Sequence, residues 1–198
     1  MPHLLVLKTP KVVLPFTHYK TTTEQQRLII NNVDEVTAHD GGPLILVTVY
    51  HYENRYAEIG CHAEQLFYYS KDKKNKLKFN CCEELTGIGR FSVRYLCFKP
   101  NVTKDLYEGI YGLPLKPKEE DIRTDLQEDL LKIARLNKDD ILKNFNRPEY
   151  VLPSLSYCIA DKLFPGDTPM ENKIRLTYLS ERSENRRLRM LKKYLFPK

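Results

Sequence analysis

The sequence predicts an α+β protein in which a β-rich half is followed by a bundle of helices. Before position 112, apolar residues recur mainly at every second position or in short β-branched runs such as Leu44–Tyr50, "LILVTVY", which are typical of strands. After position 117 they recur every three or four residues, as helices require. Gly112, Pro114 and Pro117 lie between the two patterns and predict a linker. We therefore expect two lobes, residues 1–112 and residues 113–198.

The β-rich half should contain short strands and one helix. Apolar runs at Leu4–Leu7 and Lys11–Leu14 predict two strands separated by Thr9-Pro10. Helical spacing of apolar residues predicts a short helix within Thr23–Val36, and Asp40–Pro43 predicts a turn before the strand Leu44–Tyr50. The remaining predicted strands are residues 57–69 and 76–83, which flank the polar hairpin loop Ser70–Asn75, and Arg90–Cys97.

Four helices are expected after Pro117. The first should present Ile122, Leu126, Leu130 and Ile133 on one face, and the second should begin near Pro148 with Leu155, Ile159 and Leu163 in its core stripe. Thr168-Pro169-Met170-Glu171 has the elements of a capping box and predicts the start of the third. Ser183-Glu184 should open the fourth, with Leu188, Leu191 and Leu195 facing the core.

Composition excludes several classes of protein. No apolar run approaches the roughly 18 residues that a membrane-spanning helix needs, and the N-terminus lacks the features of a secretory signal. The five cysteines, Cys61, Cys81, Cys82, Cys97 and Cys158, are an odd and scattered set, which favours free thiols in the cytoplasm.

The net charge of +6 is concentrated at the C-terminal end of the chain. Residues 173–198 carry nine Lys and Arg against two acidic residues, whereas residues 1–112 carry 14 against 12. A basic last helix of this kind can face solvent, an acidic partner or nucleic acid, and a solvated face is the interpretation that we favour.

No catalytic arrangement is evident, and we expect no enzyme activity. The chain has no Gly-x-x-x-x-Gly-Lys-Ser/Thr phosphate loop and no serine in a nucleophile motif. A hairpin centred near residue 73 would bring residues 61–64 opposite residues 81–84, which gathers Cys61, His62, Cys81 and Cys82. Adjacent strand residues point to opposite faces, however, so we expect buried thiols, no metal and no cofactor.

Four stretches, in this order and spacing, resemble the LON domain, the N-terminal substrate-binding domain of Lon proteases. They are His3–Phe16, "HLLVLKTPKVVLPF"; Ile59–Gln65, "IGCHAEQ"; Gly87–Val93, "GIGRFSV", similar to the family's Gly-x-x-Arg-x-x-Val; and the closing helix Ser183–Leu195. The sequence departs from the family pattern at Leu14-Pro15-Phe16, at His62 and at Gln65. It is identified as a divergent, stand-alone member of the family.

The resemblance implies a fold and a role. The fold is a β-rich, PUA-like lobe followed by a helical bundle, which together form one LON-type domain. The role is that of a non-catalytic module that recognises unfolded or partner polypeptide, with a possible link to ATP-dependent proteolysis through a protease or its substrates. The ATPase and peptidase modules of Lon proteases are not part of this sequence.

Aromatic residues carry the binding hypothesis. Tyrosine offers amphipathic contact area at a low cost in side-chain entropy, which suits the recognition of extended polypeptide. We expect an exposed patch for protein segments formed by Tyr50, Tyr52, Tyr56, Phe67 and Tyr69. The alternative is that these rings pack in the core.

Nucleic acid is a second candidate partner. PUA-like lobes bind RNA in other families, and the residues that would contact it here are Arg186, Arg187, Arg189 and Lys193 of the basic last helix. Against this, nucleic-acid binding needs positive charge beside stacking aromatics, and the β-rich half is close to neutral as a whole. We expect no membrane partner.

Overall fold

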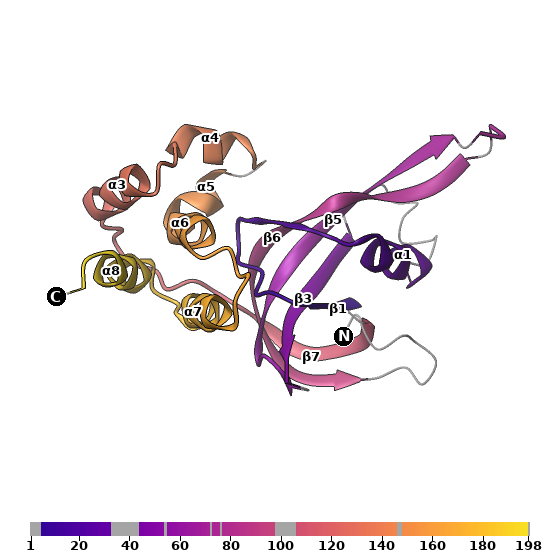
Figure 1. Ribbon diagram of the computed structural model, residues 1–198, viewed down its shortest axis with the longest axis horizontal. Helices are drawn as coiled ribbons and strands as arrows, with labels where there is room; N and C mark the ends of the chain where they lie inside the picture. Colours follow the sequence, from indigo (N-terminus) through magenta and orange to yellow (C-terminus); the bar gives the residue numbers. More distant parts are fainter. Residues whose placement is uncertain are drawn as a thin grey trace.

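The computed structural model describes residues 5–32, 44–53, 55–71, 73–75, 77–97, 106–145 and 148–197. These residues form a β-rich lobe and a helical lobe that lie side by side (Figure 1). The β-rich lobe comprises β1 (Leu5–Thr9), β2 (His18–Lys20), α1 (Thr23–Asn32), β3 (Leu44–Tyr52), β4 (Arg55–Tyr56), β5 (Ile59–Lys71), β6 (Leu77–Cys97) and β7 (Leu106–Leu115). The helical lobe comprises α3 (Thr124–Ile133), α4 (Lys138–Lys143), α5 (Pro148–Val151), a 3-10 turn at Leu152–Ser154, α6 (Leu155–Leu163), α7 (Pro169–Ser180) and α8 (Glu184–Leu195). The predicted α+β fold class is confirmed.

Five strands of the β-rich lobe close into a barrel. Their order is β1-β7-β6-β5-β3, and β1 pairs with β3 in parallel as well as with β7, so the series returns to its start. The other four pairings around the ring are antiparallel. Closure pairs the backbone groups that an open sheet would leave at its edges.

Both faces of the barrel wall are buried. Leu7, Leu46 and Cys61 belong to one cluster, which also contains Ile29 of α1, whereas Val6 and Val47 belong to a second cluster with Phe91. Successive strand residues point to opposite faces, so these neighbours mark the two sides of the wall. The near-continuous apolar run of β3 follows from this burial on both sides.

One long strand stands where two were expected. Residues 76–83 and 90–97 were predicted as separate strands, but β6 is continuous over its 21 residues. Gly87, which lies between the two predicted strands, is a point of close approach, because a Cβ there would clash with the carbonyl oxygen of Leu14. The predicted hairpin register is also wrong: Cys61 pairs with Arg90, and Cys81 pairs with Phe67. Two irregularities, between His62 and Ala63 and between Gln65 and Phe67, shift the ladder.

The start of the chain differs in detail from the expectation. Residues 11–14 form no strand, and the short strand β2, which was not predicted, pairs with β6. The predicted helix begins at Thr23 as α1, and the structure describes it as far as Asn32. Residues 33–36 and the predicted turn Asp40–Pro43 lie outside the described residues.

The helix starts predicted near Pro148, at Thr168 and at Ser183 are close to those observed. Thr168 caps α7 through a complete capping box with Glu171, and Ser183 caps α8 by accepting from the main-chain nitrogen of Arg186. Two features differ. Ile133, predicted to face the core, is exposed, since the buried stripe of α3 turns towards Gln127 and Leu131, and α4 was not predicted at all.

The two lobes are tied by buried polar side chains. Arg175 of α7 donates to the carbonyl oxygens of Val12 and Phe164, and Asn172 accepts from the main-chain nitrogen of Val12. Gly112, Pro114 and the residues around them, predicted as a linker, instead belong to β7, which runs on to Leu115. None of the helices in the described part of the chain is long and apolar enough to span a bilayer.

Candidate functional site

The first part of the site is a stacked pair of tyrosines, Tyr50 and Tyr52, at the end of β3. Tyr50 is half-buried against the core of the helical lobe, and the ring of Tyr52 stacks on it at 5.2 Å between centroids and 16° between planes. Tyr52 itself is 42 % exposed. Burial, followed by the neighbouring charges of Tyr52 and Glu53, raises the pKa of Tyr50, so the Tyr50 phenol stays neutral near pH 7. A fixed inner ring thus supports an exposed outer ring.

Tyr56 lies on the other face of the same hairpin. After a tight turn at Glu53, whose φ is 45°, His51 pairs with Tyr56 and Tyr52 pairs with Arg55. Directly opposed residues of an antiparallel pair share a face, so Tyr56 accompanies His51. Tyr56 is 39 % exposed. The hairpin therefore carries an exposed tyrosine on each side.

A cavity lies beside His51 on the face that Tyr56 shares. It has a volume of about 270 Å³ and lies between the end of β1, the start of α1 and the end of β3. Its lining residues are Lys8, Thr9, Pro10, Thr22, Glu24, Gln25, Leu28 and His51. The walls combine aliphatic stems with amide, hydroxyl and charged groups, a mixture that accommodates a side chain together with its main-chain polar atoms.

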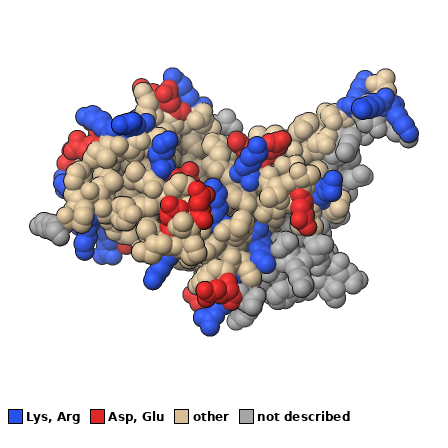
Figure 2. All heavy atoms as spheres, in the orientation of Figure 1, with Lys and Arg blue, Asp and Glu red and all other residues tan. Residues whose placement is uncertain are grey.

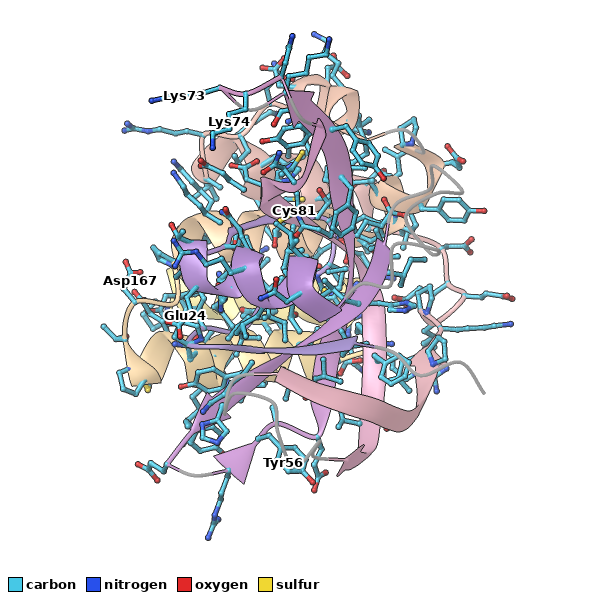
Figure 3. The ribbon with its side chains drawn as sticks, turned by 90° about the vertical axis from the view of Figure 1, so that its right-hand side faces the viewer. Glu24, Tyr56, Lys73, Lys74, Cys81 and Asp167 are labelled. Carbon is cyan, nitrogen blue, oxygen red and sulfur yellow. The ribbon has the colours of Figure 1, made fainter. Side chains whose placement is uncertain are left out.

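Phe67 and Tyr69, predicted to complete the tyrosine patch, are elsewhere. The ladder between β3 and β5 pairs Thr48 with Cys61 and ends at Leu44 and Gln65, so residues 67 and 69 continue beyond the opposite end of β3 from Tyr52. Figure 3 shows Tyr56 at one end of the molecule and Lys73 and Lys74, at the tip of the same hairpin as Tyr69, at the other. The expected single patch is therefore wrong, because the hairpin crosses the whole barrel between the two groups.

A second exposed surface lies at that far end. Leu66, Tyr68 and Tyr69 are between 50 % and 56 % exposed, and Phe67 alone packs inwards, against the core cluster of the β-rich lobe. Leu66 and Tyr68 were not among the predicted site residues. Their signal in the sequence is the apolar stretch Leu66–Tyr69. In the structure, this stretch lies beyond the residues of β5 that pair with β3.

The basic helix α8 does not present all the arginines expected of it. Arg187 is only 1 % exposed and donates from Nη2 to the buried Glu184 at 2.7 Å and from Nε to Ser156 Oγ. It lies on the apolar side of α8 with Leu188 and Leu191, so it supports the helical lobe and its predicted availability to nucleic acid is wrong. Arg186, Arg189 and Lys193 are exposed as expected.

The cysteines are not assembled into a metal site in the described residues. Among these residues, no group of three or more His, Cys, Asp or Glu side chains is placed to hold a metal ion. Burial raises the pKa of the Cys61 thiol to about 12, so this cysteine is a poor nucleophile. Burial lowers the pKa of His62, whose Nε2 has no hydrogen-bond partner and whose ring packs against Phe91.

Arg90 of the Gly-x-x-Arg stretch works at the contact between the lobes. Its guanidinium donates to the carbonyl oxygens of Leu179 and Ser180 at the end of α7 and to that of Lys116. Positive charge is favourable at a helix C-terminus, so Arg90 fastens α7 to the barrel. It borders a cavity of about 170 Å³ with Tyr157, whose pKa burial raises to about 12. Arg90 therefore stabilises the contact between the two lobes.

Comparison with solved structures identifies the architecture. The chain is similar to a Lon N-terminal domain protein from Xanthomonas campestris, with a TM-score of 0.58 and 16 % identity over 98 % of this chain and 99 % of that one. It is also similar to the N-terminal domain of the Mycobacterium avium complex Lon protease, with a TM-score of 0.55 and 16 % identity over 96 % of each chain. No family model matches the sequence, and neither does any curated protein. The resemblance inferred from the four motifs is confirmed at the level of the fold: this chain has the fold of the Lon N-terminal domains.

Proposed function

We propose that the protein is a non-catalytic module that binds extended segments of unfolded or partner polypeptide at the β3–β4 hairpin. The observation that carries this proposal is the pairing of the exposed Tyr56 with His51, which borders the 270 Å³ cavity. A segment lying over the hairpin would contact Tyr56 and place one of its side chains in the cavity. On the other face, Tyr52 would add a ring that Tyr50 already holds in place.

Two features support polypeptide as the ligand. Exposed aromatics grouped on one projection usually mark a contact surface, and tyrosine both packs and hydrogen-bonds. The fold is that of Lon N-terminal domains, which fits a substrate-recognition role linked to ATP-dependent proteolysis. The free thiols of Cys61, Cys81, Cys82 and Cys158 fit a reducing compartment such as the cytoplasm.

We further propose that the β-rich lobe and the helical lobe act together as one LON-type domain, divided after β7 ends at Leu115 and not at the predicted boundary between residues 1–112 and 113–198. The contacts of Arg175 and Asn172 with Val12 and of Arg90 with α7 support a single domain, since they join the lobes through buried hydrogen bonds. A site on the barrel would therefore keep a fixed position relative to the helices.

The proposal is tested with a reduced and carboxymethylated test protein, labelled for fluorescence anisotropy. Truncation of an aromatic residue at a true contact site costs more than about 1 kcal/mol of binding free energy. Tyr52→Ala and Tyr56→Ala should each raise the dissociation constant roughly fivefold to tenfold. Both side chains are exposed, so the melting temperature should change little.

Tyr69→Ala is the matched control. Tyr69 is also an exposed tyrosine on a strand, but it lies at the opposite end of the barrel, so the proposal expects no loss of polypeptide binding. Equal losses for Tyr52→Ala and Tyr69→Ala would indicate non-specific adhesion to aromatic surface. An unchanged dissociation constant in both Tyr52→Ala and Tyr56→Ala would contradict the proposed site.

The alternative function, RNA binding by the basic α8, now depends on fewer residues. With Arg187 buried, the predicted contact residues that reach the surface are Arg186, Arg189 and Lys193, and Arg186 lies 3.7 Å from Glu181. This geometry favours polypeptide binding as the principal function.

A further inference from the structure

The β5–β6 hairpin extends as a two-stranded arm beyond its pairings with the other described strands. We define the arm as residues 66–82. The ladder of β3 with β5 ends at Gln65, and the ladder of β2 with β6 ends at Glu84, whereas β5 and β6 stay paired as far as Lys71 and Leu77. Figure 1 shows this arm projecting away from both lobes. An isolated two-stranded ribbon is marginally stable, so we expect contacts at its base to stabilise the arm.

The base of the arm is fixed, and its outer part is open. Phe67 packs into the core cluster, and the thiol of Cys81, its cross-strand partner, approaches the carbonyl oxygen of Gln26 in α1. Further out, Asn80 Nδ2 donates to Ser70 Oγ at 2.7 Å, which ties the two strands together. Tyr68 and Tyr69 lie between these two points and are each 50 % exposed. Because they are sequence neighbours on a strand, their rings lie on opposite faces of the arm.

The tip of the arm is strongly basic. In the sequence, residues 70–80 contain five lysines, Lys71, Lys73, Lys74, Lys76 and Lys78, against the single acid Asp72. Figure 2 shows Lys and Arg side chains gathered at the tip, with no acidic side chain among the described atoms there. The β-rich half is nearly neutral as a whole, so this is a local concentration of charge.

We propose that the β5–β6 arm binds single-stranded nucleic acid, with the lysines of its tip contacting phosphates and Tyr68 and Tyr69 stacking on bases. Positive charge directly beside exposed aromatic rings is the combination that single strands require, because each base offers a stacking face and each linkage a negative charge. The bases of a duplex are already stacked and leave the tyrosines without a partner. The side chains of an acidic polypeptide such as poly-glutamate would pair with the lysines, but they offer no aromatic ring on which the tyrosines could stack.

The electrostatic part of the proposal is tested by salt dependence. Binding of labelled oligo(U) and oligo(dT) is measured at several salt concentrations for the wild type, for Lys71→Gln/Lys73→Gln/Lys74→Gln, and for Arg189→Gln/Lys192→Gln/Lys193→Gln on α8. The two triple variants remove the same charge. Loss of three phosphate contacts should flatten the slope of log K against log salt by about 2. The arm variant should show this change, and the α8 variant should keep the wild-type slope.

The stacking part is tested by the tyrosines. Tyr68→Ala/Tyr69→Ala should weaken binding of the single strands roughly tenfold or more without changing the salt slope. Tyr52→Ala, an exposed tyrosine at the other end of the barrel, should bind as the wild type does. Duplex DNA of the same length and poly-glutamate serve as competitors, and both should compete poorly. All five substituted arm side chains lie at the surface. The far-ultraviolet circular dichroism spectrum checks that each variant is folded.

Several results would overturn the proposal. Loss of binding in the α8 variant but not in the arm variant would place nucleic acid on the last helix. An unchanged affinity in the tyrosine double variant, or equal competition by duplex DNA or poly-glutamate, would reduce the arm to a general polyanion contact. Absence of measurable binding to either oligonucleotide at low salt would exclude the function. None of these outcomes affects the polypeptide site, which depends on Tyr52 and Tyr56.

Discussion

Arg175 Nε of α7 donates a hydrogen bond of 2.7 Å to the carbonyl oxygen of Val12, a residue 163 positions earlier in the chain. The same guanidinium donates to Phe164 O and forms an ion pair of 2.7 Å with Asp161. The segment around Val12 forms no strand, so this arginine satisfies a main-chain group that regular structure does not. The contact between the lobes therefore depends on a side chain that the sequence shows only as one of many basic residues.

Arg175→Met should strongly destabilise the protein. The substitution keeps the aliphatic stem but leaves the carbonyl oxygens of Val12 and Phe164 without a donor in a buried place. Removal of one partner of a buried polar network costs about 3–5 kcal/mol. Urea unfolding should register this loss, and Lys173→Met, an exposed substitution in the same helix, should change the free energy of unfolding by less than about 0.5 kcal/mol. Equal effects would show that the Val12 contact contributes little.

Arg187→Met should also destabilise the protein, whereas the neighbouring substitution Arg186→Met should not. It would leave the carboxylate of Glu184 buried with only Gln127 and Ser156 as donors. We expect a loss of about 3 kcal/mol or more, whereas Arg186→Met should be nearly neutral because Arg186 is exposed. Thermal unfolding of the two variants makes the comparison. A destabilised Arg186→Met with a normal Arg187→Met would contradict the assignment of the two faces of α8.

Thr168→Ala should remove the N-terminal cap of α7. The Thr168 hydroxyl accepts from the main-chain nitrogen of Glu171, and its loss should cost about 1 kcal/mol. Thr177→Ala is the control, since the Thr177 hydroxyl donates to Lys173 O within the same helix, where alanine is the better helix former. Stability should fall in the first variant and stay level or rise in the second. A reversed order would show that the capping box does not stabilise α7.

His62 should make stability depend on pH. Burial lowers the pKa of its imidazole below the usual 6.5, so the folded protein keeps His62 neutral at pH values where the unfolded chain already binds a proton. In that window the unfolded state holds more protons, so stability rises with pH; it is complete above about pH 6.5 and falls as the pH drops towards the folded pKa. We expect His62→Gln to lose less stability than the wild type between about pH 8 and pH 5 in urea titrations. An equal loss in both proteins would mean that His62 titrates normally in the fold.

Local signals predicted much of this fold, because they act within a few residues. The apolar run of β3 and the capping box at Thr168 depend on neighbours in the sequence, and both elements are present where expected. The four motifs that resemble LON domains also predicted the architecture, although no stretch among them is specific by itself.

Features set by distant contacts could not be predicted in the same way. The two irregularities in the β5–β6 ladder change which residues face Cys61, and nothing within the hairpin sequence announces them. The close approach of Leu14 to Gly87 likewise involves two segments that are far apart in the sequence. Tyr52, Tyr56 and Tyr69 are exposed, as expected. The distance between Tyr69 and the other two could not be predicted, because it depends on the length of a hairpin that crosses the barrel.

Hydrogen exchange with and without the carboxymethylated test protein is the decisive measurement of polypeptide binding at the β3–β4 hairpin. Exchange of main-chain amides reports where a ligand lies without any substitution in the chain. We expect slower exchange around Tyr50–Tyr56 and at the start of α1, which borders the cavity beside His51. Protection confined to α8 or to the arm, or no protection at a concentration of test protein that saturates binding, would contradict it.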